Sequence, residues 1–230
     1  MRMSALFLAA VAGTASADTF IWDYAGQAHN AAAGAIQSIN TTYNDVTEKF
    51  TWDVTFSDGA SLGTDGYTLV ISPGPNPKGI EFELAMIYFD ATSAVPEVSV
   101  YRYNGKNNAS SYLNPADLLA STKNGDPIAA GQSDNGNART FTLSIDAAAI
   151  NAAYGPPTEP DWTGIEFGAS LGIWFHPFKD LTTAYAGPEL TQWSFGMGGW
   201  LDLSDVPTVP SPAGAVALLG LAGLVARRRR

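Results

Sequence analysis

The chain has 230 residues, a formal net charge of −10 and no cysteine. The lack of cysteine excludes disulfides, zinc–thiolate sites and thiol nucleophiles. All 22 acidic residues lie between Asp18 and Asp205, with only seven of the 12 basic residues, so this segment carries a formal charge of −15. We call this segment the body. Its negative charge would be repelled by nucleic acid and by anionic lipid, and no nucleic-acid partner is expected.

The first 17 residues have the pattern of a secretory signal peptide. Residues 1–4 include Arg2 and form a short basic region, residues 5–12 are apolar, and Ala15 and Ala17 fit the small-residue cleavage site A-x-A. The pattern predicts an exported protein whose mature chain begins at Asp18.

The segment that follows is rich in strand signals. Residues 48–56 alternate apolar and polar side chains with the period of two that is typical of a half-buried strand. The same pattern recurs in residues 67–71, 141–145 and 165–176, the last with its odd-numbered side chains facing inward. Residues 80–90 become apolar on both faces, which indicates a central strand. Further candidate strands are residues 36–43, 98–103 and 191–203.

Turn-forming Gly, Pro, Asn and Asp residues separate these runs, and helical signals are few. Asp146 could cap a short helix over residues 147–153, and Asn114 with Pro115 could start a helical turn. We therefore expect an all-β protein, an antiparallel β-sandwich of jelly-roll-like form with one or two short helices. The expected organisation is a signal peptide (1–17), a β-sandwich domain (18–204), a Pro-rich linker (205–212) and a C-terminal segment (213–230).

The C-terminal segment combines an apolar run with a block of cations. Residues 213–226 contain only Ala, Gly, Leu and Val, and the run suits a helix that enters a bilayer while arginines stay on the cytoplasmic side. Fourteen residues make a helix of roughly 21 Å, shorter than a hydrocarbon core of about 30 Å, which favours transient insertion into the inner membrane. The elements of this segment are Val209, Pro210, Ser211 and Pro212, the apolar run, and Arg227, Arg228, Arg229 and Arg230.

This arrangement resembles the PEP-CTERM sorting signal of Gram-negative bacteria, with Pro-Ser-Pro standing where that family has Pro-Glu-Pro. The resemblance covers only about the last 22 residues. It implies recognition by an exosortase-like membrane protease and delivery to the outer surface or the exopolysaccharide matrix. It implies nothing about the activity of the body.

Several patterns in the body allow a chemical interpretation. Residues 168–172 fit G-x-S-x-G around Ser170, with His176 and Asp180 nearby, as in a serine hydrolase. Glu81 and Glu83 would share one strand face, as a carboxylate pair for glycoside cleavage does. Asp126 with residues 134–137 offers oxygen ligands for Ca²⁺ but lacks a recognised calcium-loop spacing. A hydrolase acting on polysaccharide thus remains an alternative, although catalytic residues, metal sites and cofactors are not predicted.

A glycan-binding face is a second alternative. Tyr101 and Tyr103 share one side of their strand, polar residues follow directly, and Trp174 lies on the side of its own strand that we expect to face outward. Flat aromatic rings beside amide groups suit sugars, whose C–H faces stack on rings while their hydroxyls bond to amides. The candidate residues are Tyr101, Tyr103, Asn104, Asn107, Tyr112 and Trp174. The leading hypothesis is a non-enzymatic protein of the cell surface or matrix, with carbohydrate binding as its alternative.

Overall fold

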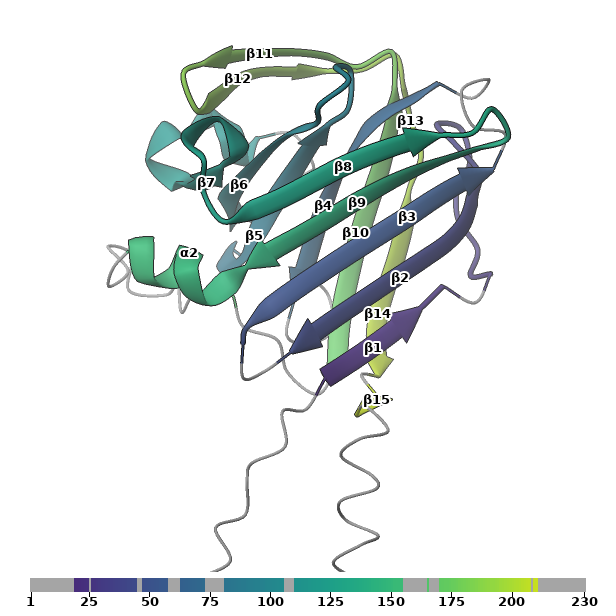
Figure 1. The fold of residues 1–230 in the computed structure, drawn as a ribbon, viewed down its shortest axis with the longest axis horizontal. Helices are drawn as coiled ribbons and strands as arrows, with labels where there is room; N and C mark the ends of the chain where they lie inside the picture. The colour runs from purple at the N-terminus through teal and green to yellow at the C-terminus, as the bar shows by residue number, and fades with distance from the viewer. Residues whose placement is uncertain are drawn as a thin grey trace, which may run out of the picture.

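A computed structural model describes residues 19–24, 26–44, 47–57, 63–72, 81–105, 110–154, 165, 170–207 and 209–210. For residues 19–23, 71–72, 81–84, 154, 170–171, 203–207 and 209–210, only the backbone is described. This part of the chain is mostly antiparallel β-structure with one short α-helix (Figure 1). The predicted signal peptide and the predicted segment 213–230 lie outside the described residues.

One sheet, which faces the viewer in Figure 1, contains six of the described strands in the order β15-β1-β2-β3-β9-β8. Its strands are β1 (Thr19–Asp23), β2 (Ile36–Asn44), β3 (Lys49–Ser57), β8 (Ile128–Asp134), β9 (Ala138–Asp146) and β15 (Val209–Pro210). Hairpins join β1 to β2, β2 to β3 and β8 to β9, whereas β3 and β9 are far apart in the sequence. The β3–β9 pairing therefore brings distant segments into one polar surface.

A second sheet has the order β13-β10-β4-β5-β6-β7 within the described chain, with β14 also paired to β10. Its strands are β4 (Thr64–Ser72), β5 (Glu81–Asp90), β6 (Glu97–Asn104), β7 (Leu118–Ser121), β10 (Ser170–Lys179), β13 (Met197–Gly198) and β14 (Leu201–Pro207). The strands β11 (Thr182–Ala186) and β12 (Glu189–Ser194) form a separate hairpin that pairs with neither sheet.

The period-two patterns are confirmed in β3 and β9. In β3, the even-numbered side chains are buried while Thr51, Asp53 and Thr55 are partly exposed. Phe141, Leu143 and Ile145 are buried in the same way on β9. The residues at 85–90 are buried on both faces of β5, which lies between β4 and β6, so the predicted central strand is also confirmed.

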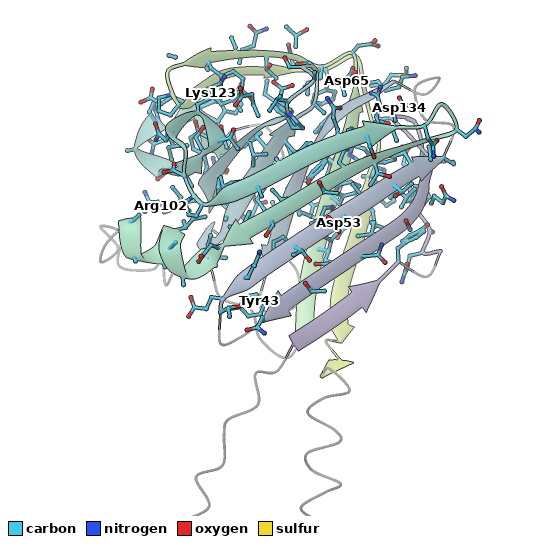
Figure 2. The ribbon with its side chains drawn as sticks, in the orientation of Figure 1. Tyr43, Asp53, Asp65, Arg102, Lys123 and Asp134 are labelled. Carbon is cyan, nitrogen blue, oxygen red and sulfur yellow. The ribbon has the colours of Figure 1, made fainter. Side chains whose placement is uncertain are left out.

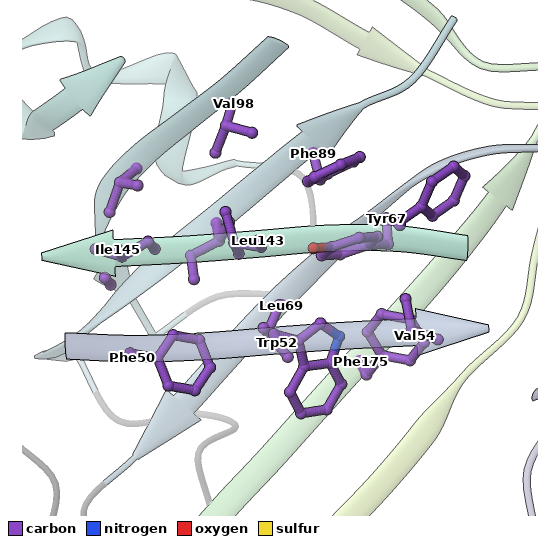
Figure 3. Packing of buried hydrophobic residues seen from close by; sticks show 14 of the residues in the cluster. Phe50, Trp52, Val54, Tyr67, Leu69, Phe89, Val98, Leu143, Ile145 and Phe175 are labelled. Carbon is purple, nitrogen blue, oxygen red and sulfur yellow. The ribbon is translucent and has the colours of Figure 1, made fainter. Parts of the chain in front are cut away.

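The buried faces of the two sheets contact one another through aromatic side chains. The Trp52 ring on β3 lies 5.3 Å from the Phe175 ring on β10, and Phe141 on β9 lies 5.3 Å from Phe89 on β5 (centroid distances). Tyr67 on β4 stacks on Phe89 at 4.6 Å. Figure 3 shows Trp52, Tyr67, Phe89 and Phe175 in the space between the strands. Burial of large apolar surface on both sides of this space is the main stabilising contribution that the described residues provide.

The predicted short helix is present as α2 (Ala147–Tyr154), and its cap is as expected. The Ala149 backbone N–H donates to Asp146 Oδ1 at 2.9 Å, which satisfies one of the donors that the first helical turn leaves unpaired. The turn predicted at Asn114 and Pro115 is a 3₁₀ helix, η2 (Pro115–Asp117). A buried ion pair between Asp117 and Arg102 holds η2 against β6.

Three expected boundaries differ in the structure. Residues 191–203 are not one strand: they contribute to β12, β13 and β14, because the chain bends at Gly196 and the strand is interrupted again at residues 199–200. Residues 131–137, whose Gly, Asn and Asp residues indicate a turn, are strand as far as Asp134. The predicted linker 205–212 is also wrong in part, because β14 continues to Pro207 and Val209 pairs with Ile21 of β1.

Proline has no backbone N–H, so it is tolerated only where a strand does not donate a hydrogen bond to its neighbour, as at the prolines of β14 and β15. Pro210 lies on the outermost strand of its sheet, opposite Phe20.

The alternation of β10 holds for Ile173 and Phe175, which face the other sheet. Its even-numbered side chain Trp174, which we expected on an open face, is instead buried in a second apolar cluster, together with Phe178 beyond the predicted strand.

Candidate functional site

The aromatic residues predicted to bind glycans lie close together in the structure, but three of them are buried under other elements of the chain. Tyr101 and Tyr103 are fully buried, and Trp174 is 3% exposed. All three belong to a cluster on the face of the second sheet that points away from the first, with Tyr112 packed against it. This corrects the expectation of exposed rings: in this structure they cannot stack on a sugar, because other side chains already occupy their faces.

The cover is the β11–β12 hairpin together with the 3₁₀ helix η1 (Ser111–Leu113). The Trp193 ring of β12 lies 5.2 Å from the Tyr88 ring of β5, and the Tyr112 ring of η1 lies 5.6 Å from Tyr88 on another side. The Leu190 backbone N–H donates to the Tyr101 hydroxyl at 2.8 Å. The outer face of the second sheet is therefore a second core, which the period-two pattern alone could not indicate.

One buried carboxylate fastens the hairpin to the sheet. Asp90, at the end of β5, accepts hydrogen bonds from the Thr183 hydroxyl at 2.6 Å and from the Tyr185 hydroxyl at 3.2 Å. Its other oxygen accepts from the backbone N–H and the hydroxyl of Thr92. Burial, together with the charge of Asp90, raises the pKa of Tyr185. Because both carboxylate oxygens have partners within the protein, Asp90 is a structural anchor.

Of the two asparagines predicted to bind glycans beside the aromatic rings, one is half-buried and the other lies outside the described residues. The Asn104 side chain is half-buried, and its amide nitrogen donates to the Ser110 hydroxyl at 3.1 Å. Asn107 lies outside the described residues. Of the six candidates, five therefore lie in one region of the structure, three of them fully covered.

The G-x-S-x-G match does not have the local geometry that this motif requires. A nucleophilic serine of this kind stands at a sharp turn from strand to helix. Ser170 is instead the first residue of β10, which continues as a strand to Lys179. His176 lies six residues along the same extended strand, at roughly 3.3 Å per residue, and is out of hydrogen-bond reach. The residues at 168–169 are outside the described part of the chain.

The remaining acidic candidates can be placed only in part. Glu81 lies in β5, as does Glu83, so the predicted strand is correct, but their side chains are not described. Asp126 and Asp134 lie at opposite ends of the strand β8, too far apart to share one Ca²⁺ ion. Asp134 instead accepts from the Gly136 N–H and pairs with Arg139. Within the described residues, no three His, Cys, Asp or Glu side chains gather where they could hold one metal ion.

A surface that sequence reasoning did not single out lies on the first sheet. The partly exposed side chains of its central strands form rows across the sheet, because the pairing aligns Thr42 with Thr51 and Thr51 with Ser144. The next row aligns Asn40, Asp53 and Thr142 in the same way. Figure 2 shows Asp53 near the middle of this face. We call this surface, formed by the outward side chains of β2, β3, β8 and β9, the hydroxyl face.

Two adjoining hollows lie on the hydroxyl face over β9. One has a volume of about 280 Å³ and is lined by side chains that include Asp126 and Asp146. The other, of about 310 Å³, is lined by Thr51, Asp53 and Thr142, among others. Both are lined by Lys49, Ala129 and Ser144. Volumes near 300 Å³ are at the lower end of the range for ligand sites.

The electrostatic character of the hollows is mildly acidic. Three carboxylates and one ammonium group line them. Burial raises the pKa of the Asp53 carboxyl, an effect that a backbone hydrogen bond from Leu143 partly offsets. Among the described residues, no aromatic ring lines either hollow, so a ligand there would be held by hydrogen bonds.

The polar alternation of residues 49–55 could have indicated this surface, but not its partner strand. Only the register of β3 with β9 brings Thr142 and Ser144 beside it.

Comparison with family models, with curated proteins and with solved structures gave no match to this chain. In the described part, no helix has both the length and the apolar character that crossing a bilayer requires.

Proposed function

We propose that this chain is an exported, non-enzymatic protein that a PEP-CTERM-like tail delivers to the outer surface or extracellular matrix of a Gram-negative-type bacterium. The observation that carries the proposal is the extent of the folded body. Its first described strand begins at Thr19, one residue after the predicted mature start at Asp18. Its last described strand ends at Pro210, within the predicted sorting motif. The described β-structure thus extends from the predicted mature start into the predicted sorting motif.

The body is proposed to be a β-sandwich formed by the two sheets. Aromatic contacts such as that between Trp52 and Phe175 support face-to-face packing. The order β10-β4-β5-β6 favours the jelly-roll-like form, because three hairpin-linked strands are followed by one that returns beside the first, which is a Greek key. The first sheet gives that form less support, since β9 returns beside β3 rather than β1.

The proposed partners are an exosortase-like membrane protease and, in the matrix, exopolysaccharide. The protease would act while residues 213–226 are transiently inserted in the inner membrane. The charge of −15 between Asp18 and Asp205 supports a soluble body held away from anionic lipid.

The pairing of β15 with β1 determines how the proposal is tested. A truncation that begins at Pro210 would remove part of β15 and disturb the fold. The informative variants are deletion of residues 213–230, which leaves β15 intact, and replacement of Arg227–Arg230 by glutamine, which leaves the length unchanged. Both are expressed in a Gram-negative host that has an exosortase-type protease.

We expect the full chain to reach the outer-surface fraction with an N-terminus at Asp18, as measured by intact mass and N-terminal sequencing. Both variants should keep their thermal unfolding transition but fail to reach the surface, because arginine is costly to move across the membrane and fixes the orientation of the segment. Surface delivery of the 213–230 deletion at the level of the full chain would refute the sorting role.

A further inference from the structure

We propose that the two hollows on the hydroxyl face form a binding groove for a polysaccharide without anionic groups. This inference rests on the proposed function, since it assigns a matrix ligand to the exported body. It places glycan binding on the first sheet rather than on the aromatic residues of the second, which the β11–β12 hairpin covers.

The groove has an open face and a low floor. No labelled element lies in front of β3 and β9 in Figure 1. The edge strand β8 contributes Ala129 opposite Ser144 and Gly131 opposite Thr142, so one side of the groove has almost no side-chain height. A Cβ atom at Gly131 would lie 2.8 Å from the Thr142 hydroxyl oxygen, so the space over this position depends on glycine.

Two hydroxyl groups of the groove differ from their neighbours on this face. Beside the groove, Thr55 and Thr140 bond to one another at 2.9 Å. Within it, the Thr51 hydroxyl is already bonded to Thr42 at 2.7 Å. Among the described residues, no hydrogen bond links the hydroxyl of Thr142 or Ser144 to another side chain. These two hydroxyls are therefore available to a ligand, whereas Thr140, two residues away on the same strand, is already paired.

The residue types of the groove match the chemistry of sugars. Carboxylates accept hydrogen bonds from ligand hydroxyls, serine and threonine both donate and accept, and Lys49 donates. Asp53 and Asp146 lie on neighbouring strands but four positions apart in register, because they pair with Thr142 and Lys49. At about 3.3 Å per residue their separation along the strands is roughly 13 Å, and an extended ligand along β9 would meet both carboxylates.

The charges define which ligands are rejected. Three carboxylates against one ammonium group, on a body of formal charge −15, repel phosphate, sulfate and uronate groups. A hydroxyl-rich polymer without those groups is compatible with the groove.

Binding is measured by isothermal titration calorimetry of the chain spanning residues 18–212 with neutral hexasaccharides of glucose, mannose, galactose and N-acetylglucosamine. An oligogalacturonate serves as the anionic probe. We expect at least one neutral probe to bind and the anionic probe not to bind.

Three variants test whether the hollows are the site. The double variant Thr142→Val with Ser144→Ala removes the two available hydroxyls and should weaken binding about tenfold. Ala129→Leu fills the space that both hollows share and should abolish binding. Thr140→Val, the matched control, removes a hydroxyl outside the hollows and should leave the affinity unchanged. Thermal unfolding of each variant confirms that it is folded.

Absence of binding to every neutral probe would overturn the groove, as would binding that Ala129→Leu leaves intact. Preference for the anionic probe would also overturn it. None of these results bears on processing at Asp18 or on the tail, so failure of the groove and failure of the sorting role are distinguishable.

Discussion

Two buried tyrosines allow the same substitution to be tested with opposite expected signs. Tyr67 and Tyr101 are both fully buried. The Tyr67 hydroxyl, in the core between the sheets, has no hydrogen-bond partner among the described residues. The Tyr101 hydroxyl accepts the Leu190 backbone N–H at 2.8 Å and so links β6 to the hairpin. Replacement by phenylalanine removes one oxygen at each site and leaves the ring.

The magnitudes follow from what each oxygen does. A buried polar group without a partner costs about 1–3 kcal/mol, so Tyr67→Phe should raise the free energy of unfolding by about 1 kcal/mol after some loss of packing. Tyr101→Phe leaves the Leu190 N–H buried without its partner and should lower the free energy of unfolding by about 1–3 kcal/mol. For a body of this size, each kcal/mol corresponds to roughly 2–4 °C in the melting temperature.

The measurement is urea unfolding of residues 18–212 followed by tryptophan fluorescence, at pH 7 and again above pH 10. Burial raises the pKa of Tyr67 well above 10.0, so above that pH the unfolded chain releases a proton that the folded chain retains. The wild-type protein therefore loses stability as the pH rises past about 10, and Tyr67→Phe should lose less. A Tyr67→Phe variant destabilised by more than 1 kcal/mol, or a neutral Tyr101→Phe variant, would contradict the assigned contacts.

Two further predictions concern carboxylates. Asp90→Asn should lower the free energy of unfolding by about 1–3 kcal/mol and speed proteolysis of the β11–β12 hairpin. The reason is that an amide cannot accept hydrogen bonds from Thr183, Tyr185 and Thr92 as a carboxylate does. Urea unfolding and limited proteolysis measure the two effects. Burial raises the pKa of Asp53, so on raising the pH this carboxyl ionises in the unfolded chain before it does so in the folded chain. The wild-type protein should therefore lose stability relative to Asp53→Asn as the pH rises from 3.8 to the folded-state pKa. Urea midpoints of both proteins at pH 3.5 and 7 measure that difference, and a difference of the opposite sign refutes it.

The sequence by itself determined which residues of single strands share a face. The alternation at residues 48–56 predicted the buried side of β3, and Asp146 was correctly identified as the cap of α2, because both depend on neighbours within a few residues. The apolar run that ends at Asp90 likewise indicated a strand buried on both faces.

Tertiary structure alone decided what covers each face. Nothing local to Tyr101 or Trp174 predicts that the β11–β12 hairpin, more than 80 residues beyond Tyr101, closes over the outer side of the second sheet. The prolines of the Asp205–Pro212 segment predicted a linker, but part of this segment pairs with β1 and is an edge strand. The hydroxyl face likewise exists only because β3 pairs with β9. A periodic pattern records which side of a strand is apolar, whereas the partner of that side is set by contacts between segments that the pattern does not connect.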